Sequence, residues 1–216
     1  TKGRKGLESL SMRQGGRTLR IEAECLAVSG GWNPSVHLAC HMNRRPEWDA
    51  RTLSFLPRDG MVLGMSVAGA ARGQFSTAAC LADGVRVAKG VVIELGLTPS
   101  DTAVPDAEDR PYRIEELWAI EGRGRKWLDF QNDVHVKDVR LAAQENFRSV
   151  EHMKRYTTQG MATDQGKNSN VAALAVLADA TGRTIPETGT TTFRPPYTPV
   201  SIAAMGAGSQ GEGFAP

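Results

Sequence analysis

The chain has 216 residues, of which 40% are hydrophobic and 23% are charged. These fractions are those of an ordinary globular protein with enough chain for one large or two small domains. Its 26 basic and 24 acidic residues leave a formal net charge of +2, so no large field points to nucleic acid or to a membrane surface as a partner.

An alternating strand is expected near the N-terminus. Leu19, Ile21 and Ala23 alternate with charged residues, which is typical of a strand with one solvated face. Residues 25–28 are continuously apolar and predict a strand covered on both faces. Gly30 and the glycine after it end that strand.

The three cysteines, Cys25, Cys40 and Cys80, are widely spaced and form no CxxC or Cys/His pattern of metal-ligand type. Cys25 and Cys80 lie inside apolar runs, so we expect buried free thiols, as in a reducing cytoplasm. No apolar stretch is long enough to span a bilayer, and no signal peptide is evident. We therefore expect a cytoplasmic protein without a membrane partner.

A strand, a small-residue turn and a helix are predicted between Met65 and Gly90. The apolar strand covers 65–69, Ser76 is the expected N-cap, and Gly90 is the expected end of a helix that reaches about residue 89. This order is typical of an α/β fold. The N-terminus of such a helix suits a phosphate or ribose oxygen.

Tight packing is the alternative explanation for the small residues at this turn, Gly69, Ala70 and Gly73. A glycine-rich strand–helix turn is weak evidence for a nucleotide by itself. The stronger GxGxxG pattern is absent from the chain.

The best domain boundary is the segment 99–111, which carries three prolines and several acids. Short helices are predicted beyond it, at 136–146, 150–158 and 170–180, the last with Ser169 as its cap and Gly182 as its end. After residue 184 the chain is rich in turns. The absence of an initiator methionine and the linker-like residues 206–213 predict a piece of a longer protein.

Two further segments invite functional interpretations. In residues 29–38 the two glycines and Trp32 suit a chain that crosses a cofactor groove, although a tight turn with a covering tryptophan explains them as well. His37 is expected to be a hydrogen-bonded structural histidine. Residues 127–139 hold three aspartates and a histidine, but their spacing fits no known metal loop, and we expect Asp133 to cap the next helix.

Residues 150–170 form the strongest candidate site. Lys154, Arg155 and Lys167, with hydroxyl and amide side chains between them, are suited to surround an anionic group such as a flavin phosphate. The alternative is a solvated helix end in which Gly160 and Gly166 are ordinary stops. No catalytic triad or carboxylate pair can be assembled, so the residues themselves indicate a binding module.

Several strings in this order resemble the large subunit of heterotetrameric sarcosine oxidase. The most specific are RSVEHMKRYTTQGMATDQGK and TTTFRPPYTP, and the others are SGGWNP, VAGAARGQFSTAACLADG and DFQNDVHVKDV. The resemblance extends over roughly residues 19–207. The chain is thus similar to an internal fragment of that subunit.

The resemblance implies an α/β fold, the C-terminal part of a two-dinucleotide-binding (Rossmann-like) domain followed by a small helical domain. The implied divisions are 1–98 for the FAD/NAD(P)-binding-like part, 99–125 for a linker, 126–184 for the helical domain, and 185–216 for a linker toward a folate-binding domain.

The resemblance also implies the oxidation of sarcosine to glycine with peroxide formation, and the transfer of the methyl carbon to tetrahydrofolate. NAD would be bound by this subunit, FMN would lie at the subunit interface, and FAD would belong to the partner beta subunit. Residues Ala70, Phe75 and Thr77 are expected to touch NAD. The turn with Arg155, Thr158 and Lys167 is the expected FMN side, and no catalytic or metal-binding residue is assigned.

Related amine dehydrogenases carry cluster cysteines where this chain has Asp129-Phe-Gln-Asn132, and carboxylates and amides do not replace thiolates around iron and sulfur. We therefore favour the oxidase. The alternatives are a flavin-dependent dehydrogenase of proline or another secondary amine, and a non-catalytic docking module. Exposed apolar strand edges and aggregation are expected of the piece by itself.

Overall fold

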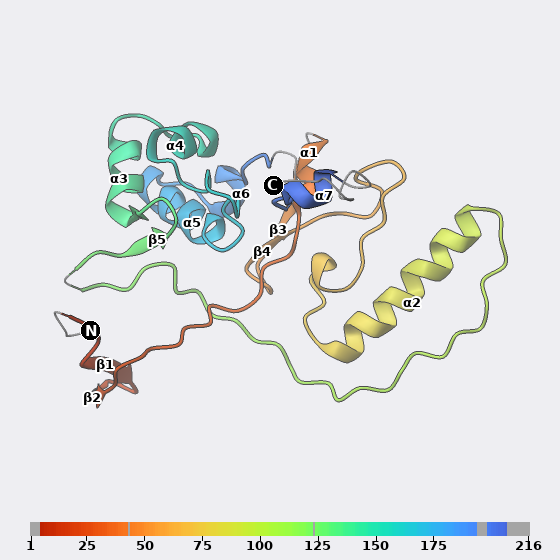
Figure 1. Cartoon of the computed structure of the whole chain (residues 1–216), viewed down its shortest axis with the longest axis horizontal. Coiled ribbons are helices and arrows are strands. Elements are labelled where there is room, and N and C mark those ends of the chain that lie inside the picture. The colour runs from red at the N-terminus through yellow and green to blue at the C-terminus, as the bar shows by residue number, and fades with distance from the viewer. Residues whose placement is uncertain (1–4, 43, 123, 194–197, 207–216) are drawn as a thin grey trace, which may run out of the picture. The chain divides into compact units, whose positions relative to one another are not determined.

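The structure is a computed structural model that describes residues 5–42, 44–122, 124–193 and 198–206. It forms two compact units, Thr1–Trp32 and Asn33–Pro216. Figure 1 traces the elements of each unit.

The first unit is a β-hairpin. Strands β1 (Ser9–Gln14) and β2 (Arg17–Glu22) pair antiparallel across Gly15-Gly16. The register sets Leu10 opposite Ile21 and Met12 opposite Leu19, so these four side chains share one face. The predicted alternating strand is confirmed.

Residues 25–28 are not a strand, and that prediction is wrong. Within the unit no described element covers this run, so Val28 is 81% exposed and Cys25 is an exposed thiol rather than a buried one. An apolar run does not by itself supply the neighbouring strand that a covered strand needs.

The second unit begins with α1 (His37–His41), the antiparallel pair β3 (Glu47–Asp49) and β4 (Ser54–Leu56), the 3₁₀ turn η1 (Gly69–Arg72) and α2 (Thr77–Glu94). The antiparallel pair β5 (Trp127–Asp129) and β6 (Val134–His135) follows. The remaining elements are α3 (Val136–Gln144), α4 (Val150–Thr157), α5 (Asn170–Thr181), α6 (Ile185–Thr188) and α7 (Ile202–Gly206).

The chain therefore contains both helices and strands, which confirms the coarse α/β prediction. Every sheet among the described residues consists of two antiparallel strands. The finer prediction, the end of a Rossmann-like domain followed by a helical one, stays a prediction. So do the domain limits; residues 99–125 contain no helix or strand where the structure describes them.

The strand predicted over 65–69 is wrong, because this segment is irregular and leads directly into η1. The helix after it is confirmed as α2, and the Ser76 side chain accepts a hydrogen bond from the Ala79 N–H as the expected N-cap. Gly90 does not end this helix. The helix continues to Glu94, and Gly96 at φ 74° takes the left-handed conformation after its end.

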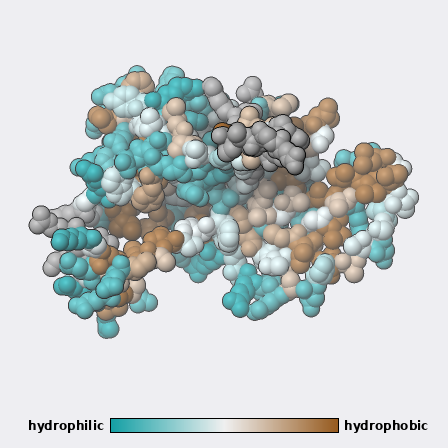
Figure 2. Space-filling view, viewed as in Figure 1, coloured by the Kyte–Doolittle hydropathy of each residue, from teal (hydrophilic) through white to brown (hydrophobic). Residues whose placement is uncertain are grey.

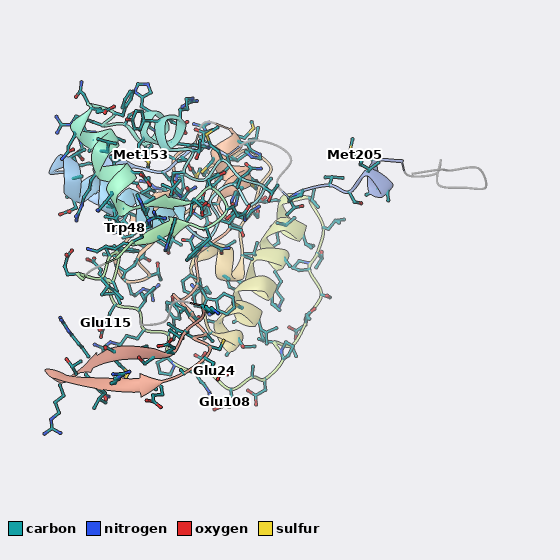
Figure 3. The ribbon with its side chains drawn as sticks, turned by 60° about the vertical axis from the view of Figure 1, so that its left-hand side comes forward. Glu24, Trp48, Glu108, Glu115, Met153 and Met205 are labelled. Atoms are coloured by element: carbon teal, nitrogen blue, oxygen red, sulfur yellow. The ribbon has the colours of Figure 1, made fainter. Side chains whose placement is uncertain are left out.

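The helices predicted beyond residue 126 are confirmed as α3, α4 and α5. They pack around one core with β5, β6 and residues of β4. Met153 (Figure 3) is 1% exposed there, and α5 is buried on most of its surface. Asp133 is not the cap of α3; it turns the chain at φ 54°, and the His135 N–H donates to Asp138 at the true N-terminus.

Hydrophobic residues gather on α2 in Figure 2. Asp83 is the only residue of this helix that is buried in the described structure. Ile93 is 62% exposed, and Leu95 just beyond the helix is 70% exposed. Among the described residues no helix is long and apolar enough to cross a membrane.

Candidate functional site

A cavity of about 970 Å³ opens beside the turn that joins α4 to α5. We call it the turn cavity. Its walls come from α4, from the turn itself and from the segment after α6; they comprise Glu151, Lys154, Arg155, Gly160, Met161, Ala162, Thr163, Gln165, Thr192 and Pro199. The size lies at the upper end of ligand pockets, which hold roughly 300–1,000 Å³.

The α4 wall carries the charged groups. Glu151 uses both carboxylate oxygens: Oε2 accepts from Arg155 Nη1 at 2.9 Å, and Oε1 accepts from the Thr192 N–H at 2.7 Å. Lys154 Nζ donates to the Thr192 carbonyl at 3.3 Å. Two cations thus face the cavity against one carboxylate, which leaves a positive excess suited to an anion.

The two most specific strings of the sequence meet here. Thr192 belongs to the TTTFRPPYTP string, and it is held by side chains of the EHMKR segment 41 and 38 residues away. Its neighbour Thr191 accepts from Asn170 Nδ2 at 3.0 Å through Oγ1. The cavity is therefore formed by tertiary contacts rather than by the turn sequence alone.

Positive φ angles shape the turn at Thr158 (63°), Gly160 (68°), Gln165 (52°) and Gly166 (74°). A Cβ at Gly160 or Gly166 would collide with the Asn170 amide. Both glycines are therefore required by close packing as well as by their backbone conformation, which is more than the role of ordinary helix stops.

A second loop braces the turn from behind. Asp129 Oδ2 accepts from the Gly160 N–H at 2.9 Å, Asn132 Nδ2 donates to the Thr158 carbonyl at 3.0 Å, and Thr163 Oγ1 donates to Gln131 at 3.1 Å. Residues 129–132 thus hold the turn at three points.

His37 lies against Phe193, the residue that follows Thr192. Its ring is 4.0 Å from that of Phe193, and the residue is 3% exposed. The pKa of His37 is lowered to about 4, mainly by burial and in smaller part by the positive charges of Lys167 and His41. The imidazole is neutral at pH 7, as a structural histidine is.

Cys40 is the buried cysteine beside Phe193, and burial raises the pKa of its thiol to about 11. It is a protonated, unreactive thiol at neutral pH. Cys80 is half-buried, and its Sγ donates to the Gln74 carbonyl.

Of the three residues predicted for the FMN side, Arg155 lines the cavity, whereas Thr158 and Lys167 are absent from its described lining. Thr158 begins the turn, and Lys167 acts electrostatically on His37. Glu151 and Thr192 were not identified from the sequence as residues of this site. The i,i+4 spacing of Glu151 and Arg155 was a local signal for the first, but no local signal marks Thr192.

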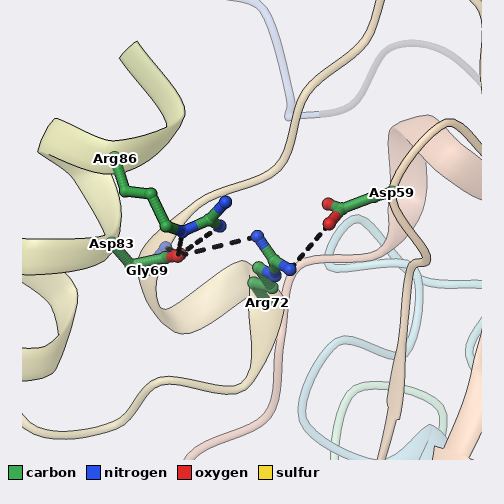
Figure 4. A network of polar contacts seen from close by, with 5 residues as sticks. All are labelled: Asp59, Gly69, Arg72, Asp83 and Arg86. Atoms are coloured by element: carbon green, nitrogen blue, oxygen red, sulfur yellow. Dashed lines mark hydrogen bonds and ion pairs between the residues drawn. The ribbon is translucent and has the colours of Figure 1, made fainter. Parts of the chain in front are cut away.

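The turn predicted to touch NAD is built differently from a phosphate cradle. The Gly69 N–H donates to Asp83 Oδ2 at 2.9 Å, and Arg72 Nη2 donates to Asp59 at 2.6 Å (Figure 4). Arg86 binds Asp83 as well. The donors best placed for an anion are therefore bound to carboxylates.

The three residues predicted to touch NAD remain accessible. Ala70 and Thr77 are exposed, and Phe75 is half-buried with its ring 4.6 Å from that of Tyr112. Their apolar and hydroxyl groups suit a ribose or a ring rather than a phosphate. For Gly73 the packing explanation holds, because a Cβ there would lie 2.8 Å from Leu56 Cδ1.

Comparison with known proteins gives consistent matches. Residues 123–209 match the family described as Sarcosine oxidase A3 domain. The sarcosine oxidase subunit alpha of Rhizobium meliloti (strain 1021) is 45% identical over 219 residues, which cover 100% of this chain and 22% of that protein. The subunit alpha of Corynebacterium sp. (strain P-1) is 40% identical over 209 residues, or 93% of this chain and 22% of that protein.

This chain is homologous to the sarcosine oxidase alpha subunit. It spans about 22% of the length of these curated relatives. Their names describe the whole subunit. What a whole subunit does is therefore a separate question from what these residues do.

A likeness of fold extends to the crystal structure of L-proline dehydrogenase from P. horikoshii. The TM-score is 0.70 at 16% sequence identity, over 94% of this chain and 43% of that chain. At this identity the likeness concerns the fold alone.

Proposed function

We propose that this chain is part of the alpha subunit of a sarcosine oxidase. The whole enzyme would oxidise sarcosine to glycine, reduce oxygen to hydrogen peroxide, and pass the methyl carbon to tetrahydrofolate. The observation that carries the proposal is the 45% identity along the whole chain to a subunit of that name. The partner subunits, chiefly an FAD-bearing beta subunit, belong to the same proposal.

Within the enzyme, the turn cavity would form the FMN side of the subunit interface. Lys154 and Arg155 provide positive charge for a phosphate, and Met161, Ala162 and Pro199 provide apolar surface for a ring system. The residues present thus fit a flavin nucleotide. FMN supplies electron transfer to oxygen when it is bound, and the chain's own part is to hold the anionic group and exclude water.

Thr158 and Lys167 keep their place in this proposal at the two ends of the turn. Lys167 contributes positive charge to the region, as its effect on His37 indicates. NAD would contact Ala70, Phe75 and Thr77. Because Asp83 and Asp59 occupy the neighbouring donors, that contact would involve the ribose or a ring of NAD, and its phosphates would be held elsewhere in the subunit.

The other candidate enzyme is a flavin-dependent dehydrogenase of proline or another secondary amine. The structural neighbour is named as an L-proline dehydrogenase, but at 16% sequence identity the similarity of fold does not indicate the substrate of this chain. The absence of cysteine from residues 129–132 favours the oxidase. A docking module without catalytic function is the third candidate, and it predicts that changing Thr77 leaves both turnover and NAD content unchanged.

The experiment that tests the proposal uses the full-length subunit co-expressed with its partners. The purified complex is assayed with sarcosine in air, and peroxide, flavin and iron are measured. Peroxide formation with two flavins and no iron is expected. Turnover that requires an artificial acceptor, or that takes place with proline in place of sarcosine, would overturn the oxidase assignment.

A further inference from the structure

Asp129 has an unusual set of partners for a carboxylate. It is 3% exposed, and no cation binds it among the described residues. Instead Oδ1 accepts from the N–H groups of Gln131 and Asn132 at 2.9 and 3.2 Å, while Oδ2 accepts from the Gly160 N–H at 2.9 Å. A buried carboxylate is tolerated when backbone donors satisfy it in this way.

The chain contains a second turn that separates the local part of this arrangement from the tertiary part. In the β3–β4 hairpin, Asp49 Oδ1 accepts from the N–H groups of Arg51 and Thr52 at 2.7 and 3.3 Å. The local turn is the same as at Asp129, but no bond to a distant backbone group is present in the described structure. The bond to Gly160, 31 residues away, is therefore an addition to the turn motif.

Gly160 lines the turn cavity. Its Cα side is closed by Asn170 and its N–H is bound by Asp129, so the peptide has little freedom to move. Asn132 and Gln131, which the Asp129 turn presents, bind Thr158 and Thr163 on either side of it. The wall 160–163 thus depends on the loop that Asp129 organises.

We propose that Asp129 is the positioning residue of the turn cavity: its carboxylate fixes the wall 160–163 on which the bound group rests. The inference deepens the proposed function, since it assigns the geometry of the FMN-side site to a residue that does not touch the ligand.

The substitution Asp129→Asn distinguishes this role sharply. A carboxylate accepts on both sides, whereas an amide has one accepting oxygen and one donating nitrogen. In either orientation the amide would set a donor against a backbone N–H, either in the local turn or at Gly160. Asp49→Asn is the matched control. The turn at Asp49 uses one side-chain oxygen, and the single oxygen of the asparagine amide can replace it.

The test measures hydrogen exchange and the visible circular dichroism of the flavin in the assembled complex. In D129N we expect exchange of residues 158–165 to accelerate by about tenfold or more, the range of a hydrogen bond to a charged group. Exchange in α5 should stay as in the parent protein, and the flavin band should change. D49N should alter neither readout.

Two results would overturn the proposal. One is unchanged exchange at 158–165 in D129N, and the other is acceleration spread equally over α3 and α5, which would make Asp129 a general support of the fold. Should D129N fail to fold, the parent protein decides: an unprotected Gly160 amide overturns the proposal, and a protected one supports it. Local acceleration with an unchanged flavin band would support the positioning role and contradict the flavin assignment of the cavity.

Discussion

At the scale of single residues, the fold sets the protonation of His37. The imidazole is packed on Phe193, and its pKa is lowered to about 4, first by burial and then by Lys167 and His41. Because the folded state holds the proton less tightly than the unfolded state, with a pKa near 6.5, protonation favours unfolding. The contribution of neutral His37 to the unfolding free energy should therefore be fully present above pH 6.5, and it should be lost as the pH is lowered toward 4.

We predict that protonation of this histidine lowers the unfolding free energy by at most about 3 kcal/mol between pH 6.5 and 4. This is the free energy that corresponds to the difference in its pKa between the folded and unfolded states. The substitution His37→Gln should flatten the pH dependence of the urea midpoint in that window. His152→Gln, at an exposed position, is the control and should leave the slope as it is. An unaltered slope in His37→Gln would show that the lowered pKa has no energetic consequence.

Glu151 is the second residue with a separable role, since each of its oxygens binds a different wall of the cavity. The side chain is 32% exposed, so we expect Glu151→Ala to lower the unfolding free energy by about 1 kcal/mol, below the full value for a charged hydrogen bond. Glu151→Gln keeps an acceptor for Thr192 and should lose less. Urea unfolding measures both, with exposed Glu116→Ala as the control; equal losses in the two Glu151 variants would argue against a hydrogen-bonding role.

At the scale of elements, the helices were predictable because their signals are local. Apolar periodicity and the caps gave the start of α2 at Ser76 and both ends of α5, whereas the end of α2 was placed about five residues too early. The strand expected at 65–69 was not formed, since an apolar run without alternation does not specify a strand. For the site, the clustered donors pointed to the turn, but Thr192 joins it only through contacts across about forty residues.

The glycines of the turn allow a prediction that separates backbone conformation from packing. Gly160, Gly166 and Gly182 all have φ between 65° and 74°, so alanine costs about 1–2 kcal/mol at each for the left-handed conformation. Asn170 crowds the first two, and nothing lies within 4 Å of a Cβ at Gly182. Gly160→Ala and Gly166→Ala should thus destabilise the helical core clearly more than Gly182→Ala, as measured by urea midpoints; three equal losses would mean that Asn170 moves aside.

At the scale of the whole molecule, each unit leaves apolar surface uncovered. In the hairpin, Leu19 and Ile21 are 45% and 39% exposed on the face they share with Leu10 and Met12. A two-stranded hairpin is marginally stable in water without a covered face. In the second unit, α2 and the residues after it present further apolar side chains. Exposed apolar patches of this kind drive association between molecules.

We predict that the 216-residue chain associates with itself at micromolar concentration when it is prepared without partners. Ile93 and Leu97 are each 62% exposed at the end of α2, so changing both to glutamine should lower the associated fraction in light scattering. Leu63→Gln removes one fully exposed leucine outside this surface and should have little effect. A monomer with a single cooperative melting transition would contradict the prediction, because it would mean that the two units tolerate their apolar faces in water.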